Sequence, residues 1–470
     1  MTRKFSSRRA PSRQDPSLGA LAAVLVPGGV LALLSTTVVG VAVPDIVRDL
    51  GSDVAAAQWV TTAYLLAAGV AIPLGGWAGV RLGTRRTWVV ALTLFAVGSL
   101  LAALAGGFGA LTAGRVVQGL GGGALEPLML TTLAQGAGAA RIGRVMGATA
   151  AAMSLGPVAG PALGGVVVDS LGWRWTFAFT AGAAAAVLVG SLAVLPRGAG
   201  ARARLDVPGL LLLAVATSSG LYGLSRGATA TGFDRAARGW VALGAAALVG
   251  FVAWARRRGE RAIVDVATFA RPGFGPAVAI MALMGAAIYP LFFGLPLYYQ
   301  GVTGLDPAAA GLLMMPYGLG TLVAMPVAGR LSDRVDGRLL VWAGAALALG
   351  GFLGLVATGA TTPVWVLGGL SLVIGIGLGS VGSPTVSTLY RVLPSALVPS
   401  GSTTLFVVNQ LGGALGVALL VVLVGGAGWT SAVGTTPFWL PVGAVLGITA
   451  VAVRLRGSSG PDSATAVGSR

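Results

Sequence analysis

Two ionisable side chains lie inside an otherwise apolar stretch and are the first candidates for chemistry. Arg115 and Glu126 fall within GRVVQGLGGGALEPLML, residues 114–130. They are eleven residues apart, close to three helical turns, so a helix would place both on one face, about 16 Å apart along its axis. That separation is too long for a direct ion pair. The two residues would instead mark an outer and an inner level of one polar track, with Gln118 nearby.

The elements that must position these residues are long apolar helices. Of the 470 residues, 55% are hydrophobic and only 10% are charged, about half the charge of a typical soluble protein. A helix needs about 20 apolar residues to cross a bilayer. Uncharged runs of that order cover residues 16–44, 54–80, 87–114, 145–168, 175–196, 207–225, 239–255, 272–305 and 307–329. Two longer runs, 339–390 and 392–453, each have a break near the middle and count twice. With the Arg115 stretch, the sequence predicts an all-α polytopic membrane protein with fourteen transmembrane helices.

The distribution of basic residues predicts the orientation. An even number of helices puts both termini on one side. That side then holds 25 of the 31 basic residues, the other side holds 5, and Arg115 lies within the bilayer. Loops rich in Arg and Lys face the cytoplasm. We therefore expect a multi-pass protein of the cell membrane with both termini in the cytoplasm, and an uncleaved first span after the basic tail.

Several classes of protein are disfavoured by composition. Cysteine and histidine are absent, which excludes thiol chemistry and removes the commonest metal ligand and the usual proton carrier. We expect no metal and no cofactor. The sequence has no paired acids at catalytic spacing, and its glycine clusters lie inside apolar helices, so we expect no enzyme. The net charge of +17 lies mainly in short loops, where topology explains it; we expect no nucleic-acid partner, with anionic lipid as a secondary attraction.

Two short repeats indicate an internal duplication. GWAGVRLGTR at 76–85 matches GRLSDRVDGR at 329–338 at three places, with an offset of 253 residues. GPALG at 160–164 matches GGALG at 412–416, with an offset of 252 residues. Paired helical halves are the architecture of alternating-access transporters, whose substrate site lies between the halves near the midplane.

The repeats also predict the domain organisation. The expected segments are a cytoplasmic tail (1–15), an N-terminal six-helix bundle (16–196), a linker carrying inserted helices 7 and 8 (197–269), a C-terminal six-helix bundle (270–456) and a second tail (457–470).

Nine segments carry a set of motifs: GWAGVRLGTRR (76–86), GRVVQGLGGG (114–123), GPVAGPALGG (156–165), WRWTF (173–177), LSTTVVGVAVPDI (34–46), QWVTTAYLL (58–66), LDVPG (205–209), LPLYYQ (295–300) and NQLGGALGVAL (409–419). In these segments the chain resembles the major facilitator superfamily, and specifically its fourteen-helix drug:proton antiporter branch. The sequence departs from the pattern of that branch at three places. Ser35 replaces an aspartate, Gly40 an asparagine and Val80 an acid, although the C-terminal copy of the loop signature keeps Asp333.

The resemblance implies proton-coupled efflux of hydrophobic or cationic drugs, antibiotics or secreted metabolites, by one chain acting alone. Glu126 is the expected proton carrier, because an acid inside a span must face a cavity or a partner, or stay protonated. The resemblance implies a part in proton handling for Arg115, and Asp45 is a second, shallower station. The structural alternatives are that Glu126 bonds a neighbouring helix and that Arg115 bonds exposed carbonyls of the first helix.

Further residues are candidates for substrate binding and gating. The expected cavity residues are Tyr64, Gln118, Glu126, Tyr298, Gln300, Asn409 and Gln410. The expected gating residues are Gly76, Arg81, Arg85, Arg86, Gly156, Pro157, Gly160, Pro161, Gly164, Arg330, Asp333 and Arg334. Topological anchoring is the alternative for the arginines, and tight helix packing for the glycines and prolines. Two other functions stay open, a proton-independent facilitator of the same fold and a non-transporting membrane sensor.

Overall fold

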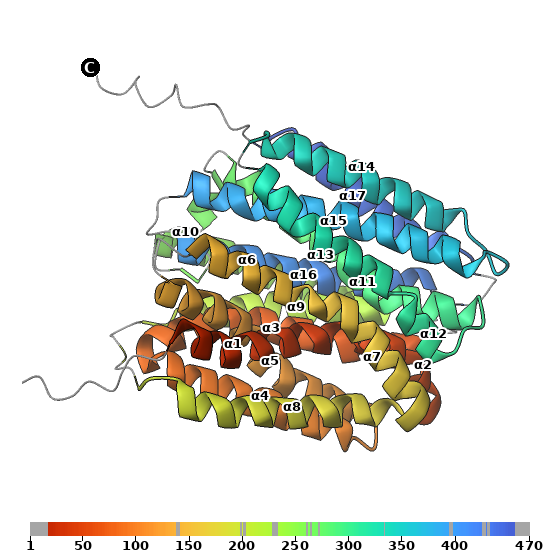
Figure 1. Ribbon diagram of the computed structural model, residues 1–470, viewed down its shortest axis with the longest axis horizontal. Helices are drawn as coiled ribbons and strands as arrows, with labels where there is room; N and C mark the ends of the chain where they lie inside the picture. Colours follow the sequence, from red (N-terminus) through yellow and green to blue (C-terminus); the bar gives the residue numbers. More distant parts are fainter. Residues whose placement is uncertain are drawn as a thin grey trace, which may run out of the picture.

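The structure is a computed structural model that describes residues 17–137, 142–197, 200, 204–227, 234–259, 262–263, 266–270, 273–332, 334–393, 398–424, 429 and 433–455. The regular elements in these ranges are all helices, and most of them run side by side along one direction (Figure 1). Runs of apolar residues produce this arrangement, because a backbone in lipid must satisfy its hydrogen bonds within each segment.

The first half of the chain forms one group of helices, called the N-bundle below. Its helices are α1 (Leu18–Thr37), α2 (Val39–Asp49), α3 (Val54–Leu82), α4 (Thr84–Ala103), α5 (Phe108–Ala137), α6 (Ile142–Met153), α7 (Leu155–Leu171) and α8 (Trp173–Val194). Two of its turns use Gly83 and Gly172, whose φ values of 86° and 90° favour glycine. The helix pairs α1–α2 and α6–α7 are each interrupted at a single residue, Val38 and Ser154.

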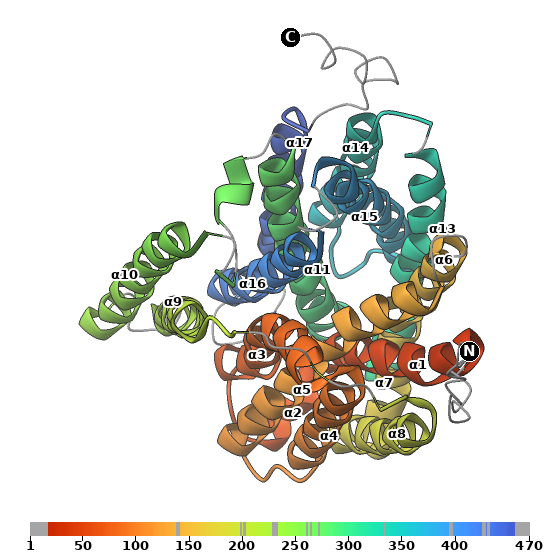
Figure 2. The same ribbon diagram turned by 90° about the vertical axis from the view of Figure 1, so that its left-hand side faces the viewer.

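The second half of the chain forms the C-bundle. Its elements are the 3-10 helix η2 (Val266–Ala270), α11 (Phe274–Gly301), α12 (Pro307–Leu312), α13 (Met315–Leu331), α14 (Gly337–Val356), α15 (Val364–Val392), α16 (Val398–Val424), the 3-10 helix η4 (Thr436–Phe438) and α17 (Trp439–Ala452). Viewed along the helices, the N-bundle and the C-bundle lie on opposite sides of a central interface (Figure 2).

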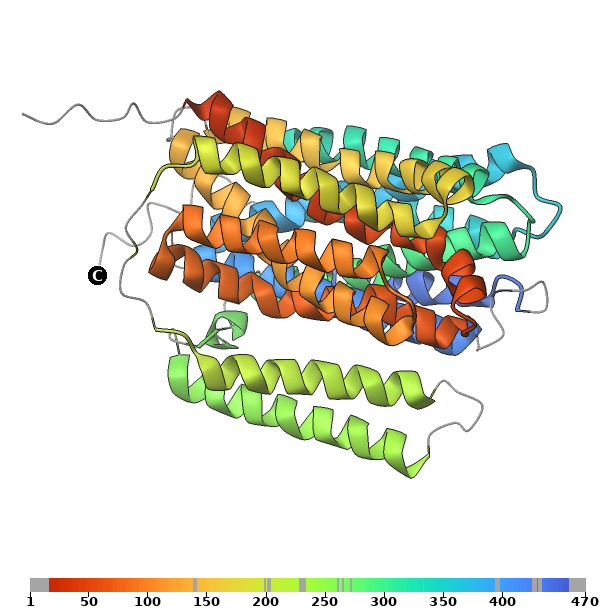
Figure 3. The same cartoon turned by 90° about the horizontal axis from the view of Figure 1, so that it is seen from below.

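A separate antiparallel pair, α9 (Val207–Gly227) and α10 (Arg235–Arg258), stands on one flank of the molecule (Figure 3). Its apolar contacts reach α3 and α16, so it touches both bundles. Asp206 stabilises the end of the pair at which α9 begins and α10 ends. Its buried carboxylate accepts hydrogen bonds from the backbone N–H of Gly209 and Ile263 and from Nε1 of Trp254, at 3.2, 3.1 and 2.8 Å.

Twelve helices among the described residues are long and apolar enough to cross a membrane, and Thr436–Ala452 is a shorter apolar helix. The 30-residue α5 is not among the twelve. Its Arg115, Gln118 and Glu126 lower its hydropathy, although it packs inside the N-bundle against α3 and α4. The structure therefore has twelve candidate spans rather than a confirmed set of fourteen.

The two bundles repeat one tight contact between their first and fifth spans. A Cβ added to Gly164 of α7 would lie 2.9 Å from Cγ1 of Val38, and one added to Gly416 of α16 would lie 2.7 Å from Cγ of Pro290. Both residues of the second contact follow those of the first by 252 residues, the offset of the GPALG and GGALG repeats. The same packing therefore occurs in both halves at corresponding positions.

Candidate transport cavity

A cavity of about 250 Å³ lies between the two bundles. Its walls come from α1, α3, α5, α6 and α7 on one side and from α11, α13, α15 and α16 on the other. Its polar lining residues are Thr36, Thr37, Tyr64, Glu126, Ser154, Tyr289, Tyr317, Thr321, Asn409 and Gln410. The remaining lining is mainly aliphatic, with three methionines and two phenylalanines. A mostly apolar cavity with a few polar groups is typical of a small-molecule site.

Of the described residues that line the cavity, Glu126 is the only charged one. It lies on α5 with its side chain partly buried. Within the described part of the chain, no ion pair or hydrogen bond holds its carboxylate. Tyr64 of α3 and Tyr289 of α11 are close enough to interact with it electrostatically. The acid is thus available to a proton or to a cationic ligand.

Arg115 is fully buried in the wall of the N-bundle, outside the cavity. Its Nε donates a hydrogen bond to the carbonyl oxygen of Val60 at 2.7 Å, and Nη1 donates to Oγ of Ser35 at 2.9 Å and to Oε1 of Gln118 at 2.5 Å. Gln118 in turn donates to Oγ of Ser99 at 2.7 Å. This chain of bonds joins α1, α3, α4 and α5 through one guanidinium group. The structural alternative expected bonds from Arg115 to carbonyl groups of the first helix. Arg115 instead bonds the hydroxyl of Ser35 on that helix, and the carbonyl group that it bonds is that of Val60 on α3.

Tyr64 connects this buried network to the cavity. The guanidinium carbon of Arg115 lies 4.3 Å from the centre of the Tyr64 ring. The hydroxyl of the same tyrosine donates to the carbonyl oxygen of Ala32 at 3.1 Å and lines the cavity near Glu126. A Cβ at Gly122, one turn before Glu126, would lie 2.3 Å from that hydroxyl. Tyr64 therefore contacts Arg115 in the wall and lines the same cavity as Glu126.

The structure brings four of the expected substrate residues together at the cavity: Tyr64, Glu126, Asn409 and Gln410. Asn409 also donates from Nδ2 to the carbonyl oxygen of Met281 at 3.0 Å, whereas Oε1 of Gln410 is buried without a partner.

Gln118, Tyr298 and Gln300 are not among the residues that line the cavity. Gln118 belongs to the Arg115 network. The hydroxyl of Tyr298 lies 2.9 Å from Oγ1 of Thr358 in an aromatic cluster. Gln300 donates to the carbonyl oxygen of Val41 at 3.1 Å and so joins the two bundles. Asp45 is also outside the cavity, where it pairs with Arg48 at 2.7 Å.

Sequence reasoning missed several cavity residues, chiefly Tyr289, Tyr317 and the pair Thr36 and Thr37. One signal was present for Tyr317. It follows Tyr64 by 253 residues, the offset of the loop repeats. Applying that offset to each polar residue of the first half would have found it.

The expected glycine stripe of α7 packs against the first span. A Cβ at Gly156, Gly160 or Gly164 would meet Leu33, Thr37 or Val38, the second at 2.0 Å from Oγ1. Contacts of α7 with the other bundle lie on a neighbouring face. There a Cβ at Gly311 of α12 would be 2.2 Å from the carbonyl oxygen of Pro161. Pro157 lines the cavity itself.

The expected basic gate residues occupy the ends of helices. Arg85 donates to the carbonyl oxygens of Leu195 and Leu192 at 2.9 and 2.7 Å, so it caps the end of α8 within the N-bundle. Arg81, Arg86, Arg330 and Arg334 are exposed, as is Gly76. Asp333 lies outside the described residues.

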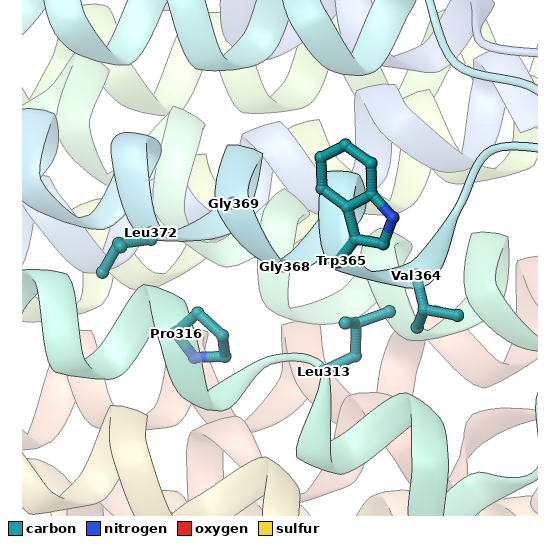
Figure 4. A pocket seen from close by; sticks show the side chains of 7 residues that line it. All are labelled: Leu313, Pro316, Val364, Trp365, Gly368, Gly369 and Leu372. Carbon is teal, nitrogen blue, oxygen red and sulfur yellow. The ribbon is translucent and has the colours of Figure 1, made fainter.

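A second hollow, of about 450 Å³, lies between the start of α13 and α15 (Figure 4). Its lining is apolar and open to the outside of the bundle, with Trp365 78% exposed. It is larger than the central cavity, but it is shallow and carries no charged residue. The central cavity is therefore the better candidate for chemistry.

Two helical bundles that enclose a cavity at their interface, in a chain of many membrane-spanning helices, define the class of polytopic membrane transporters. The family model described as "Major Facilitator Superfamily" matches residues 25–417. The chain belongs to this superfamily.

Its relatives include proteins named for drug resistance. "Multidrug resistance protein B homolog" of Mycobacterium tuberculosis is 36% identical over 89% of this chain and 78% of its own length. "Puromycin resistance protein pur8" of Streptomyces alboniger is 32% identical over 91% of this chain and 86% of its own length. "Putative multidrug resistance protein MdtD" of Cronobacter sakazakii is 31% identical over 84% of both chains.

Among solved structures, the xylose transporter XylE from E. coli, in a partially occluded inward open conformation, has a TM-score of 0.65. The match covers 94% of this chain and 99% of that one, at 16% identity. At such low identity, the likeness extends to the fold alone.

Proposed function

We propose that this protein is a proton-coupled exporter that removes hydrophobic, cationic small molecules from the cell by alternating access. One observation carries the proposal: among the described residues, Glu126 is the only charged one that lines the cavity between the bundles, and no ion pair to it is found there. A carboxylate in that position binds either a proton or a cation. Competition for one site makes the two fluxes exclude each other, which is the basis of exchange.

The walls of the cavity support the same class of substrate. Met153, Met284 and Met325 are flexible, polarisable side chains that adapt to ligands of different shape. Phe292 and Phe406 add aromatic rings to the lining, and such rings attract cations. The relatives named for multidrug and puromycin resistance are consistent with this chemistry.

We further propose that fourteen helices cross the membrane. The twelve candidate spans would be completed by α5 and α17. The first packs between α3 and α4, and the second packs against α11 and α14. In this arrangement the charges of α5 face protein or cavity instead of lipid, which is how ionisable groups persist in a bilayer. Both termini would then lie in the cytoplasm of a cell that carries the protein in its cytoplasmic membrane. We also propose that one chain is the functional unit, because both bundles that line the cavity belong to the same chain.

Gating is proposed to involve the close seam between α7 and the C-bundle. Gly156, Gly160 and Gly164 hold α7 against the first span, and Pro161 contacts Gly311 across the seam. The basic residues at the helix ends, with Asp333, would act at the cytoplasmic face. The role assigned to Asp45 is a peripheral proton station.

The experiment uses the full chain in proteoliposomes under an imposed inward proton gradient. Efflux of a fluorescent lipophilic cation is followed for the wild type, Glu126→Gln and Asp45→Asn. We expect gradient-driven efflux to be lost in Glu126→Gln, with binding of neutral ligands kept, and to be reduced at most mildly in Asp45→Asn. A protonophore should abolish efflux by the wild type.

Two results would overturn the proposal. Equal gradient-driven transport by Glu126→Gln and the wild type would remove Glu126 from coupling. Counterflow that is independent of pH in every variant would indicate a proton-independent facilitator. The serine at position 35 would agree with that result, because the drug:proton antiporter branch has an aspartate there.

A further inference from the structure

Tyr289 lines the cavity, and the proposed function assigns it no role. It lies on α11, in the C-bundle, and its side chain lines the cavity opposite α5. Among the described residues no hydrogen bond is found for its hydroxyl, although the group interacts electrostatically with Glu126, Tyr64 and Tyr317. Tyr289 of the C-bundle and Glu126 of the N-bundle therefore line the same cavity.

The packing around Tyr289 holds its ring in place. A Cβ at Gly413 of α16 would lie 2.1 Å from Cδ2 of Tyr289, so the ring lies on bare backbone. One turn further along α11, a Cβ at Gly40 of α2 would lie 1.8 Å from the carbonyl oxygen of Phe292. The ring is therefore fixed within the C-bundle, and the helix that carries it is pressed against the N-bundle close by.

The other tyrosines at the cavity are differently engaged. The hydroxyl of Tyr64 donates to Ala32, and its ring stacks on Arg115. Tyr317 of α13 stands at the corresponding place in the C-bundle and packs edge-on against Phe292, with ring centres 5.1 Å apart. Among the described side chains, the titratable groups that face Glu126 at the cavity are these two and Tyr289. Of the three, Tyr289 is from the opposite bundle and has electrostatic contact with the acid.

We infer that Tyr289 is the positioning residue by which the C-bundle responds to the ionisation of Glu126. An ionised carboxylate accepts a hydrogen bond from the tyrosine hydroxyl, directly or through a water. This charge-assisted hydrogen bond draws the bundles together across the cavity. A protonated carboxyl, or one neutralised by a bound cation, gives that bond up. The inference rests on the proposed role of Glu126 as the coupling acid.

The test measures ionisation of Glu126 without any ligand. Infrared difference spectra of the purified full chain, recorded across pH 5 to 9, follow the C=O band of the protonated carboxyl. Glu126→Gln identifies that band by removing it. Tyr289→Phe deletes only the donor. Tyr299→Phe is the matched control, because Tyr299 is a buried tyrosine of the same helix whose hydroxyl meets Ser371 at 3.1 Å outside the cavity.

The direction of the expected shift follows from the bond. Removing a donor to the carboxylate disfavours the ionised form, so in Tyr289→Phe the band should persist to higher pH, by about one pH unit. Tyr299→Phe should titrate as the wild type does. In the Glu126→Gln background, adding Tyr289→Phe should cause no further change in transport.

The outcomes separate this inference from the proposed function. A Tyr289→Phe protein that titrates with the same midpoint as Tyr299→Phe would overturn the inference, even if Glu126→Gln abolishes coupled efflux. Full coupled efflux by Glu126→Gln would overturn the proposed function instead. A Tyr289→Phe protein with weaker substrate binding but an unchanged titration would assign the hydroxyl to substrate contact and refute the link to ionisation.

Discussion

Gly40 of α2 and Phe292 of α11 occupy corresponding positions in the two bundles and are in contact with each other. They are separated by the same 252 residues as the GPALG and GGALG repeats. A Cβ at Gly40 would lie 1.8 Å from the carbonyl oxygen of Phe292. Corresponding residues of two related halves meet only on the axis that relates them. The contact therefore lies at the axis that relates the two bundles, and it is a close approach of backbone to backbone.

Replacing Gly40 with alanine should disturb this contact. The added methyl group meets backbone, which cannot move aside as a side chain can, and overpacking of this kind costs about 1–3 kcal/mol. We expect transport to fall while the chain still inserts. The measurement is the rate of cross-linking between engineered cysteines on α2 and α11, in a chain that has no native cysteine. Gly182→Ala, at a glycine of α8 with open space around it, is the control; equal cross-linking rates in the two variants would contradict the prediction.

Arg115→Lys should destabilise the N-bundle. Lysine keeps the charge but lacks the planar fork that reaches Val60, Ser35 and Gln118 together. Hydrogen bonds to charged groups contribute about 1.5–3 kcal/mol each, so we expect a loss of at least about 2 kcal/mol. Thermal unfolding in detergent measures it, with the exposed Arg86→Lys as control.

The same variant distinguishes two roles for Arg115. If the guanidinium is mainly a strut, transport per folded molecule should keep its dependence on the proton gradient. If it handles protons, that dependence should weaken even in the folded fraction. An unchanged unfolding temperature would instead show that the bonds to Arg115 are dispensable.

Gly160→Ala should loosen the contact between α7 and α1. The new Cβ would lie 2.0 Å from Oγ1 of Thr37, which donates hydrogen bonds to the carbonyl oxygens of Leu34 and Gly156. We expect a lower unfolding temperature, corresponding to about 1–3 kcal/mol. Adding Thr37→Ala should recover part of the loss, because it removes the obstructing oxygen. A stabilised single variant would mean that the helix gains more from alanine than the contact loses.

Asp206→Asn should destabilise the inserted pair at the end where α9 begins and α10 ends. The three groups around the carboxylate are all donors, and an amide presents them with one oxygen and two N–H groups. We expect a loss of about 1–3 kcal/mol and faster protease cleavage beside α9 and α10. Asp234→Asn, in the exposed ion pair with Arg226 at the other end of the pair, should have little effect. Equal cleavage of the two variants would argue against the role of Asp206.

Hydropathy and spacing predicted the helical class and the cavity placement of Glu126, because both depend on local properties of the chain. Spacing placed Arg115 and Glu126 on one helix face but could not give the depth of the cavity along that face. Gln118 shares the face with Arg115 and yet bonds Ser99 inside the wall. Tyr298 and Gln300 failed to reach the cavity for the same reason, being nine and eleven residues beyond Tyr289 on α11.

Tyr289 could not be chosen from the sequence, because its position depends on how α11 packs against α16 and on which of its faces lines the cavity. Gly413, whose backbone accommodates the ring of Tyr289, is one of 76 glycines in the chain. Glycine content that high shows that helices approach closely without showing which pairs meet. The corresponding residue of the N-bundle, Thr37, is also a poor guide, since it has a different side chain and bonds backbone carbonyls.

In the proposed exchange, Glu126, the one carboxylate among the described residues that line the cavity, would set the charge balance of the transport cycle. A monovalent cation leaving in exchange for one entering proton moves no net charge, so the exchange would respond to the pH difference and be indifferent to the membrane potential. A neutral substrate exchanged for one proton would carry current, and each 100 mV would then contribute about 2.3 kcal/mol. With Glu126 as the proposed coupling acid, the charge of the substrate would therefore decide whether the cycle carries current.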